Sequence, residues 1–205
     1  MHIPSSFNEE NPEVLLDIMR ANAFATIITN DEDGKPIATS LPFLVIQRDE
    51  KIILQAHFAK TNPQWQQLED NKQVLVIFNG PHCYISPSWY KNGGVPTWNY
   101  VTVHAYGAAT LYASTETAEL IETLSDQYEK SQEKPWVAKS NYSEKMLDHI
   151  VGFEINVQEL LGKVKIGQNK SGEDLLGVLQ GLQNTSSEQD LAIAGLIKKY
   201  LESKD

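Results

Sequence analysis

The sequence predicts a protein of the α+β class built on an antiparallel β-barrel. At least six segments rich in β-branched and aromatic residues follow one another at short spacing. Helical patterns are inserted among them without the regular alternation of strand and helix that is typical of parallel sheets. The 205 residues suffice for one domain and a small addition, since a domain holds roughly 100 to 200 residues.

The first predicted elements are a helix and a β-hairpin. Asn11 is a suitable N-cap and Pro12 a suitable first helical residue, so a helix of about three turns is expected to follow. Residues 24–29 and 37–46 have strand character, and they flank an acidic turn sequence that ends in Gly34. These two segments are predicted to pair as a hairpin.

Further strands are predicted over residues 52–58, 73–78, 83–85, 98–112 and 153–166. The run of apolar residues 74–78 indicates a strand that is covered on both faces. Helices are predicted over residues 62–70, 114–130 and 143–150. From residue 168 onward the pattern indicates two amphipathic helices, the last one capped by Ser187 and packed on the barrel or on a partner chain. We therefore expect a barrel domain, residues 1–166, and a C-terminal helical appendage, residues 167–205.

Charge and cysteine content limit the classes of function. The chain has 17 basic and 27 acidic residues and a formal net charge of −10. Direct nucleic-acid binding is therefore disfavoured, because it depends on Lys and Arg that neutralise phosphates. Cys83 is the only cysteine, which excludes an internal disulfide. No signal peptide and no apolar run near the ~20 residues of a membrane helix are present, so we expect a cytoplasmic protein without a membrane partner.

Residues 57–62 form the segment best suited to bind a phosphate group. His57 lies at the end of a predicted strand, and Lys60, Thr61 and Asn62 follow just before the predicted short helix. Free backbone N–H groups at a helix N-terminus and the charge of Lys60 both favour an anion. A short helix that is simply well capped is the commoner alternative, and the local sequence leaves both interpretations open.

The strand over residues 98–112 has one polar face. Tyr100, Thr102, His104 and Tyr106 alternate with apolar residues, which indicates a cofactor cleft, a subunit interface or a solvated strand face. The preceding loop, residues 84–98, carries aromatic residues and two adjacent glycines. It is interpreted either as a lid over a planar ligand or as a loop that packs on the barrel.

Several common kinds of site are disfavoured by the absence of their motifs. The sequence contains no G-x-S-x-G, G-x-G-x-x-G or G-x-x-x-x-G-K pattern, which argues against a hydrolase, a Rossmann dehydrogenase and a P-loop NTPase. The five histidines lack the spacing of metal ligands, so no metal site is predicted.

Taken together, these segments resemble one known family, the PaiB-type FMN-binding negative transcriptional regulators, which are relatives of the pyridoxamine-phosphate-oxidase-like split barrels. The likeness extends over nearly the whole chain. It is carried by residues 1–4, His57, and residues 60–63, 84–90, 95–100, 103–107, 167–170, 174, 177, 178, 181 and 182.

The resemblance implies a homodimeric split β-barrel with flavin-binding clefts at the dimer interface. It places the FMN phosphate at Lys60, Thr61 and Asn62, and the flavin ring beside the strand that contains residues 39–41. The full set of cofactor-binding positions that we expect on this basis is Thr39, Ser40, Leu41, His57, Lys60, Thr61, Asn62, Asn99, Tyr100, Thr102, His104, Gln168 and Asn169.

The function implied by the resemblance is that of a negative transcriptional regulator, or repressor, that acts indirectly or through a flavin or another small-molecule ligand. One alternative is an FMN-dependent oxidase or reductase of the pyridoxamine-phosphate-oxidase-like class. Another is a haem-binding or haem-degrading split-barrel protein. No motif identifies a general acid or base, so no catalytic residue is assigned and the question of enzymatic activity stays open.

Overall fold

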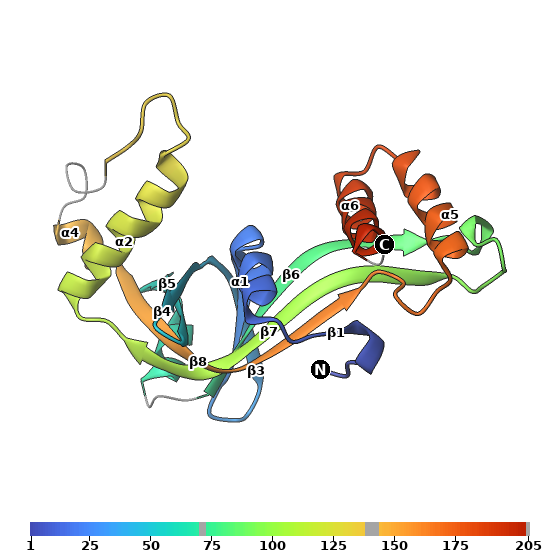
Figure 1. The fold of residues 1–205 in the computed structure, drawn as a ribbon. Helices are drawn as coiled ribbons and strands as arrows, with labels where there is room; N and C mark the ends of the chain where they lie inside the picture. The colour runs from blue at the N-terminus through green and yellow to red at the C-terminus, as the bar shows by residue number, and fades with distance from the viewer. Residues whose placement is uncertain (70–72, 138–143, 204–205) are drawn as a thin grey trace. The chain divides into compact units, whose positions relative to one another are not determined.

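The computed structural model describes residues 1–69, 73–137 and 144–203, and it confirms the α+β class (Figure 1). Helices lie at the periphery of one β-sheet and at the C-terminal end of the chain. In chain order the elements are η1 (Ser5–Phe7), β1 (Asn8–Glu9), α1 (Pro12–Ala21), β2 (Phe24–Asn30), β3 (Pro36–Pro42), β4 (Leu44–Arg48), β5 (Lys51–Ala59), η2 (Pro63–Leu68), β6 (Gln73–Ile85), η3 (Pro87–Trp89), β7 (Thr97–Leu111), α2 (Ser114–Glu129), α4 (Glu144–Leu147), β8 (Ile150–Lys165), α5 (Gly172–Gln183) and α6 (Glu188–Glu202).

The eight strands form a single sheet in the order β3-β2-β6-β7-β8-β5-β4, with β1 paired to β8. The predicted hairpin is confirmed: β2 and β3 are antiparallel, with Thr26 opposite Ser40. Strands β4, β5 and β8 are also antiparallel neighbours, and their register sets Gln55 opposite both Leu44 and Glu154. Strand β3 lies at one edge of the sheet and β4 at the other.

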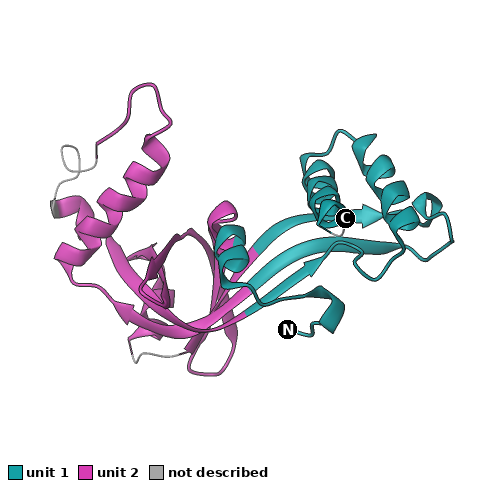
Figure 2. Ribbon diagram, viewed as in Figure 1, with its two compact units in different colours: residues 1–18, 79–103, 161–205 teal, residues 19–78, 104–160 magenta. Residues whose placement is uncertain are grey.

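Contacts between residues group the chain into two compact units (Figure 2). Unit 1 consists of residues 1–18, 79–103 and 161–205, and unit 2 of residues 19–78 and 104–160. Strands β6, β7 and β8 each contribute residues to both units. The division predicted from the sequence, between residues 166 and 167, stays a prediction, because compact grouping is not a test of independent folding.

The core of unit 2 is built around four phenylalanine side chains without exposed surface. Phe43 contacts Phe78 and Phe153, with ring centroids 6.0 and 6.2 Å apart, and Phe58 stacks on Phe153 at 5.1 Å. Phe43 also explains why residues 37–46 form two strands rather than one. Its side chain turns into the core while its N–H donates to the carbonyl of Ala23, which separates β3 from β4.

The core of unit 1 is formed by α5 and α6 on one face of β6 and β7. Ser171 and Ser187 cap the two helices by accepting hydrogen bonds from backbone N–H groups, which confirms the predicted cap at Ser187. The buried residues of this core are Cys83, Ile85, Val101, Ile166, Leu175, Val178, Leu182, Ile193, Ala194 and Ile197.

Two predicted elements have different limits in the structure. Residues 73–85 form one continuous strand, β6, which lies between β2 and β7 in the sheet and passes the predicted break without interruption. The helix expected over residues 143–150 is reduced to Glu144–Leu147, since β8 begins at Ile150, and its first predicted residue lies outside the described part of the chain. Within residues 1–69, 73–137 and 144–203, no helix has both the length and the apolar character needed to cross a membrane.

Candidate functional site

Lys60 and Thr61 lie in the exposed connection between β5 and η2. The backbone of this connection is fixed, because the N–H of Lys60 donates to the carbonyl of His149 at 2.8 Å and the indole of Trp65 donates to the carbonyl of Lys60 at 3.1 Å. The Lys60 ammonium forms no ion pair with the residues that the structure describes. The segment therefore presents an uncompensated positive charge on an ordered backbone.

Asn62 joins this connection to the edge strand β3. Its side-chain oxygen accepts from the N–H of Gln64 at 3.0 Å, which caps η2 as predicted, and its amide nitrogen donates to Thr39 Oγ1 at 3.1 Å. The Thr39 hydroxyl in turn donates to Gln64 Oε1 at 2.5 Å. The structure thus brings Thr39 and the Lys60–Asn62 segment together, although both polar groups of Asn62 are already engaged.

Gln64 is the residue of this site that the sequence did not reveal. It has no exposed surface, and its amide nitrogen donates to Thr29 Oγ1 at 3.0 Å and to the carbonyl of Ile37 at 3.1 Å. These bonds link η2 to both strands of the β2–β3 hairpin. A glutamine in a short polar segment gives no local signal of burial, because its partners lie 25 to 37 residues away.

His57 and His104 each have a buried side-chain nitrogen, Nδ1, without a hydrogen-bond partner in the described structure. Burial lowers the pKa of both imidazoles below the usual value, so both are expected to be neutral at physiological pH. Such unsatisfied buried nitrogen atoms are uncommon in folded proteins and are candidates for contact with a ligand.

Ser40 and Leu41 belong to the exposed edge strand beside this site. Ser40 is exposed, and its hydroxyl lies 3.1 Å from that of Thr26 on the neighbouring strand, while Leu41 is half-buried. The expected positions in unit 2 are therefore distributed over β3, β5, the connection to η2, and β7, which contains His104.

Five expected cofactor positions lie in unit 1: Asn99, Tyr100, Thr102, Gln168 and Asn169. Asn99 and Thr102 are buried, and Thr102 Oγ1 donates to Asn79 Oδ1 at 3.2 Å. Gln168 closes the turn after β8, because it accepts from the N–H of Ile166 and donates to the carbonyl of Val164. Its side chain thus has a structural role, whereas Asn169 is exposed.

Tyr100 lies on a face of β7 where cations gather. The ammonium groups of Lys163 and Lys165 lie 5.1 and 6.0 Å from the centre of its ring. Lys165 also donates to Thr97 Oγ1 at 2.6 Å, and burial lowers the pKa of its ammonium. Tyr100 therefore already carries two cation–π contacts within unit 1.

The aromatic loop of unit 1 is held against the C-terminal helices. Trp89 lies against Gly177 and Gly181 of α5, and Tyr90 lies under the ammonium of Lys170 at 4.6 Å. Packing rather than a free lid therefore describes this end of the loop. Trp98 at the other end is 53% exposed.

Comparison with known proteins gives a family match, one relative matched over its full length and others matched over part of theirs. The family model described as "Putative FMN-binding domain" matches residues 1–159. The protein named "Protease synthase and sporulation protein PAI 2" of Bacillus subtilis is 38% identical over 208 residues, which cover all of both chains. An uncharacterized protein of Emericella nidulans is 34% identical over 188 residues, with 75% of each chain covered.

Two solved structures share the fold at low sequence identity. The FAD and heme binding protein from Mycobacterium smegmatis gives a TM-score of 0.63 at 16% identity and covers 82% of this chain and 78% of its own. The flavocytochrome Anf3 from Azotobacter vinelandii gives a TM-score of 0.60 at 16% identity, and the match covers 85% of this chain and 78% of the flavocytochrome chain. These likenesses support the antiparallel split-barrel fold.

Proposed function

Because this chain belongs to the family of FMN-binding domains that matches its residues 1–159, we propose that it binds FMN and acts as a negative transcriptional regulator controlled by that flavin or by another small molecule. The observation that carries the proposal is the full-length likeness to a bacterial protein named for protease synthase and sporulation. The ordered connection with the unpaired Lys60 supplies a place for the phosphate.

The chemistry of the residues around Lys60 fits an FMN phosphate. This phosphate carries up to two negative charges, and Lys60 offers a full positive charge without a competing carboxylate among the described residues. The exposed Thr61 can add a hydroxyl donor. Asn62 and Thr39 are bonded to each other and to Gln64, so we assign them the role of positioning the connection.

The buried imidazoles support a ligand with polar ring atoms. A neutral histidine can donate from one ring nitrogen and accept at the other, and the Nδ1 atoms of His57 and His104 have no partner among the described residues. When bound, FMN would supply a redox-active isoalloxazine ring with several hydrogen-bonding atoms. The proposal gives these histidines, Ser40 and Leu41 the role of contacting that ring.

We further propose that the protein acts as a cytoplasmic homodimer. Large apolar side chains are exposed in the single chain, including Phe24 at 72% and Trp98 at 53%. Exposed aromatic residues of this kind are typical of subunit interfaces. Sedimentation velocity at micromolar concentration should give the mass of a dimer, and a monomer at that concentration would overturn this part of the proposal.

Regulation is proposed to be indirect. The net charge of −10 opposes the phosphate contacts that nonspecific DNA affinity needs. A ligand-dependent contact with another protein agrees better with this charge. An electrophoretic mobility assay with promoter DNA should therefore show no complex at physiological salt, with or without FMN.

The flavin part of the proposal is tested with a charge deletion. We expect Lys60→Ala to weaken FMN binding by roughly ten- to a hundredfold, because a charge-assisted hydrogen bond contributes about 1.5 to 3 kcal/mol. Lys51→Ala is the matched control, since it removes an exposed lysine at the opposite end of β5 from Lys60. Affinity is measured by flavin fluorescence titration at fixed ionic strength. Equal affinities of the parent and Lys60→Ala would place the phosphate elsewhere.

A further inference from the structure

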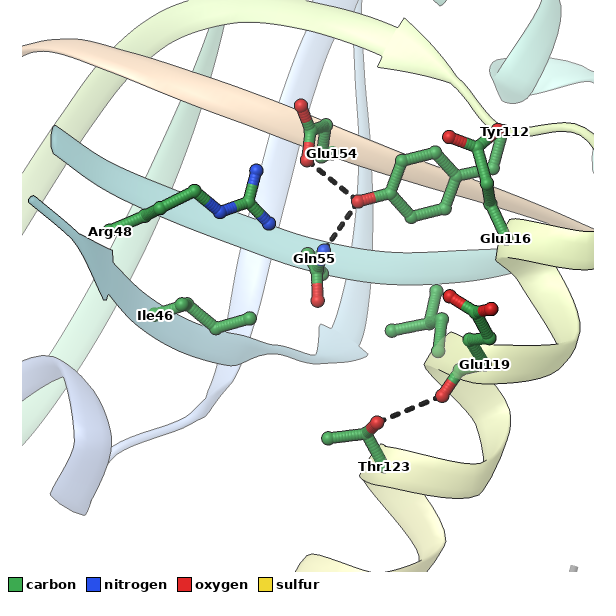
Figure 3. Close-up of a pocket in the computed structure, with 9 residues that line it drawn as sticks. Ile46, Arg48, Gln55, Tyr112, Glu116, Glu119, Thr123 and Glu154 are labelled. Carbon is green, nitrogen blue, oxygen red and sulfur yellow. Dashed lines mark hydrogen bonds between the residues drawn. The ribbon is translucent and has the colours of Figure 1, made fainter.

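Unit 2 contains a hollow of about 350 Å³ whose lining includes none of the residues proposed to hold the flavin (Figure 3). It lies between helix α2 and strands β4, β5 and β8. Its charged and polar lining residues comprise one guanidinium, three carboxylates and three neutral polar groups: Arg48, Glu116, Glu119, Glu154, Gln55, Tyr112 and Thr123. A volume of this size is at the lower end of the range of roughly 300 to 1,000 Å³ for small-molecule pockets.

The floor of the hollow is a fixed group of three hydrogen-bonded side chains. Gln55 and Glu154 are opposite each other on β5 and β8. The Tyr112 hydroxyl donates to Glu154 Oε2 at 2.7 Å and accepts from the amide nitrogen of Gln55 (Figure 3). Burial and the neighbouring carboxylate raise the pKa of Tyr112, so its hydroxyl stays protonated.

The helical wall is held in place independently of any ligand. Leu120 and Leu124 of α2 are buried against Leu44 of β4, next to the hollow. Glu116 closes a hydrogen bond to the N–H of Ala113 at the start of the helix. Buried apolar packing and a capped N-terminus mean that the hollow is formed before a ligand arrives.

Charges of opposite sign face the hollow from its two sides without being paired. Figure 3 shows the guanidinium of Arg48 directed from β4 toward the Gln55–Tyr112–Glu154 group, with Glu119 on the α2 side. Neither Arg48 nor Glu119 forms an ion pair with the described residues. The Oε1 atom of Glu154 likewise has no hydrogen-bond partner in the described part of the chain.

We propose that this hollow binds a small zwitterion of the amino-acid type, whose carboxylate pairs with Arg48 and whose ammonium group pairs with Glu119 and Glu154. A simple anion would be repelled by the carboxylates that α2 and β8 contribute to the lining. A simple cation would leave the Arg48 guanidinium without a partner. A ligand with both charges satisfies both sides, and it would be recognised by bidentate contact at the guanidinium.

The ligand binds α2 and three strands at once, and it therefore stabilises the folded state by mass action. The first experiment is a thermal-shift screen of the flavin-free full-length protein with each standard amino acid at millimolar concentration, followed by calorimetry of the best one. We expect at least one amino acid to raise Tm. No response to any of them would overturn the proposal.

Charge-deletion variants then identify the site. Arg48→Gln and Glu119→Gln should each weaken the bound amino acid at least tenfold, while Glu122→Gln on the same helix should leave its affinity unchanged, since Glu122 does not line the hollow. The methyl ester and the N-acetyl derivative of that amino acid should both bind at least tenfold more weakly. Equal binding of either derivative, or of both lining variants, would overturn the proposal. Because these experiments use the flavin-free protein, such a result does not bear on the proposal that the protein binds FMN.

Discussion

Replacement of Gln64 by methionine tests how the connection at the proposed phosphate site is held. The change removes an amide with no exposed surface and keeps a side chain of similar length, so the loss of packing should be small. Three partners lose a hydrogen bond, namely Thr39 Oγ1, Thr29 Oγ1 and the carbonyl of Ile37. The remaining contact, to the carbonyl of Ile27 at 3.4 Å, is long and contributes little.

The expected effect follows from these three bonds. Each contributes a net free energy of about 0.5 to 1.5 kcal/mol, so Gln64→Met should lower the free energy of unfolding by about 2 to 4 kcal/mol. With a urea m-value of about 3 kcal/mol/M, the midpoint of unfolding should fall by about 1 M. Thr39, which accepts a hydrogen bond from Asn62, loses its own acceptor on Gln64, and FMN affinity should therefore fall as well.

Urea unfolding followed by tryptophan fluorescence measures the change directly. Gln66→Met is the matched control, because Gln66 is exposed in the same short helix. Its midpoint should stay within about 0.2 M of the parent. If Gln64→Met behaves like Gln66→Met, the buried amide does not hold the connection in place.

Three further predictions concern other parts of the two units. Burial lowers the pKa of His57 in the folded state, so the unfolded chain binds more protons than the folded chain as pH falls below the usual pKa of 6.5. The free energy of unfolding should therefore drop between pH 7 and pH 5.5. If His57→Gln shows the same slope of unfolding free energy against pH, this prediction is contradicted. Burial and the charge of Asp190 raise the pKa of Cys83 to about 12. Its thiol should therefore resist iodoacetamide at pH 8 in the native protein and react with it in urea. Rapid alkylation of the native protein would contradict the burial of this thiol. Gly177→Ala should destabilise the protein by about 1 to 3 kcal/mol, because the added Cβ would lie 2.1 Å from the carbonyl oxygen of Trp89. Gly195→Ala on the open side of α6 should instead stabilise it by up to about 1 kcal/mol. If thermal unfolding ranks the two variants the other way, the described contact between Gly177 and Trp89 is contradicted.

Elements with strong local signals could be predicted from the sequence. The caps at Asn62 and Ser187 and the β2–β3 hairpin depend on residues close together in the chain, and the structure confirms them. The uninterrupted course of β6 past Gly80 could not be predicted, because β6 is hydrogen-bonded between β2 and β7, which lie elsewhere in the chain. Local composition predicted two separate strands, residues 73–78 and 83–85, whereas strand formation also depends on neighbouring strands that the local sequence does not contain.

The candidate site shows the same limit. Lys60 and Asn62 could be singled out because they follow a strand and precede a capped short helix. The contact between Asn62 and Thr39 joins residues 23 positions apart, and the burial of Gln64 depends on both strands of the hairpin. The hollow beside α2 was not predicted, since its lining comes from three strands, one helix and Tyr112 and no two of its charged groups form a motif.

The most direct test of FMN binding at Lys60 is a comparison of FMN with riboflavin, which lacks the phosphate. Equilibrium fluorescence titration of the full-length protein should give a Kd for FMN at least tenfold lower than the Kd for riboflavin, because the phosphate contributes a charge-assisted contact of about 1.5 kcal/mol or more. In Lys60→Ala this ratio should approach one. Equal affinity of the parent protein for the two flavins, or no binding of FMN, would contradict the account.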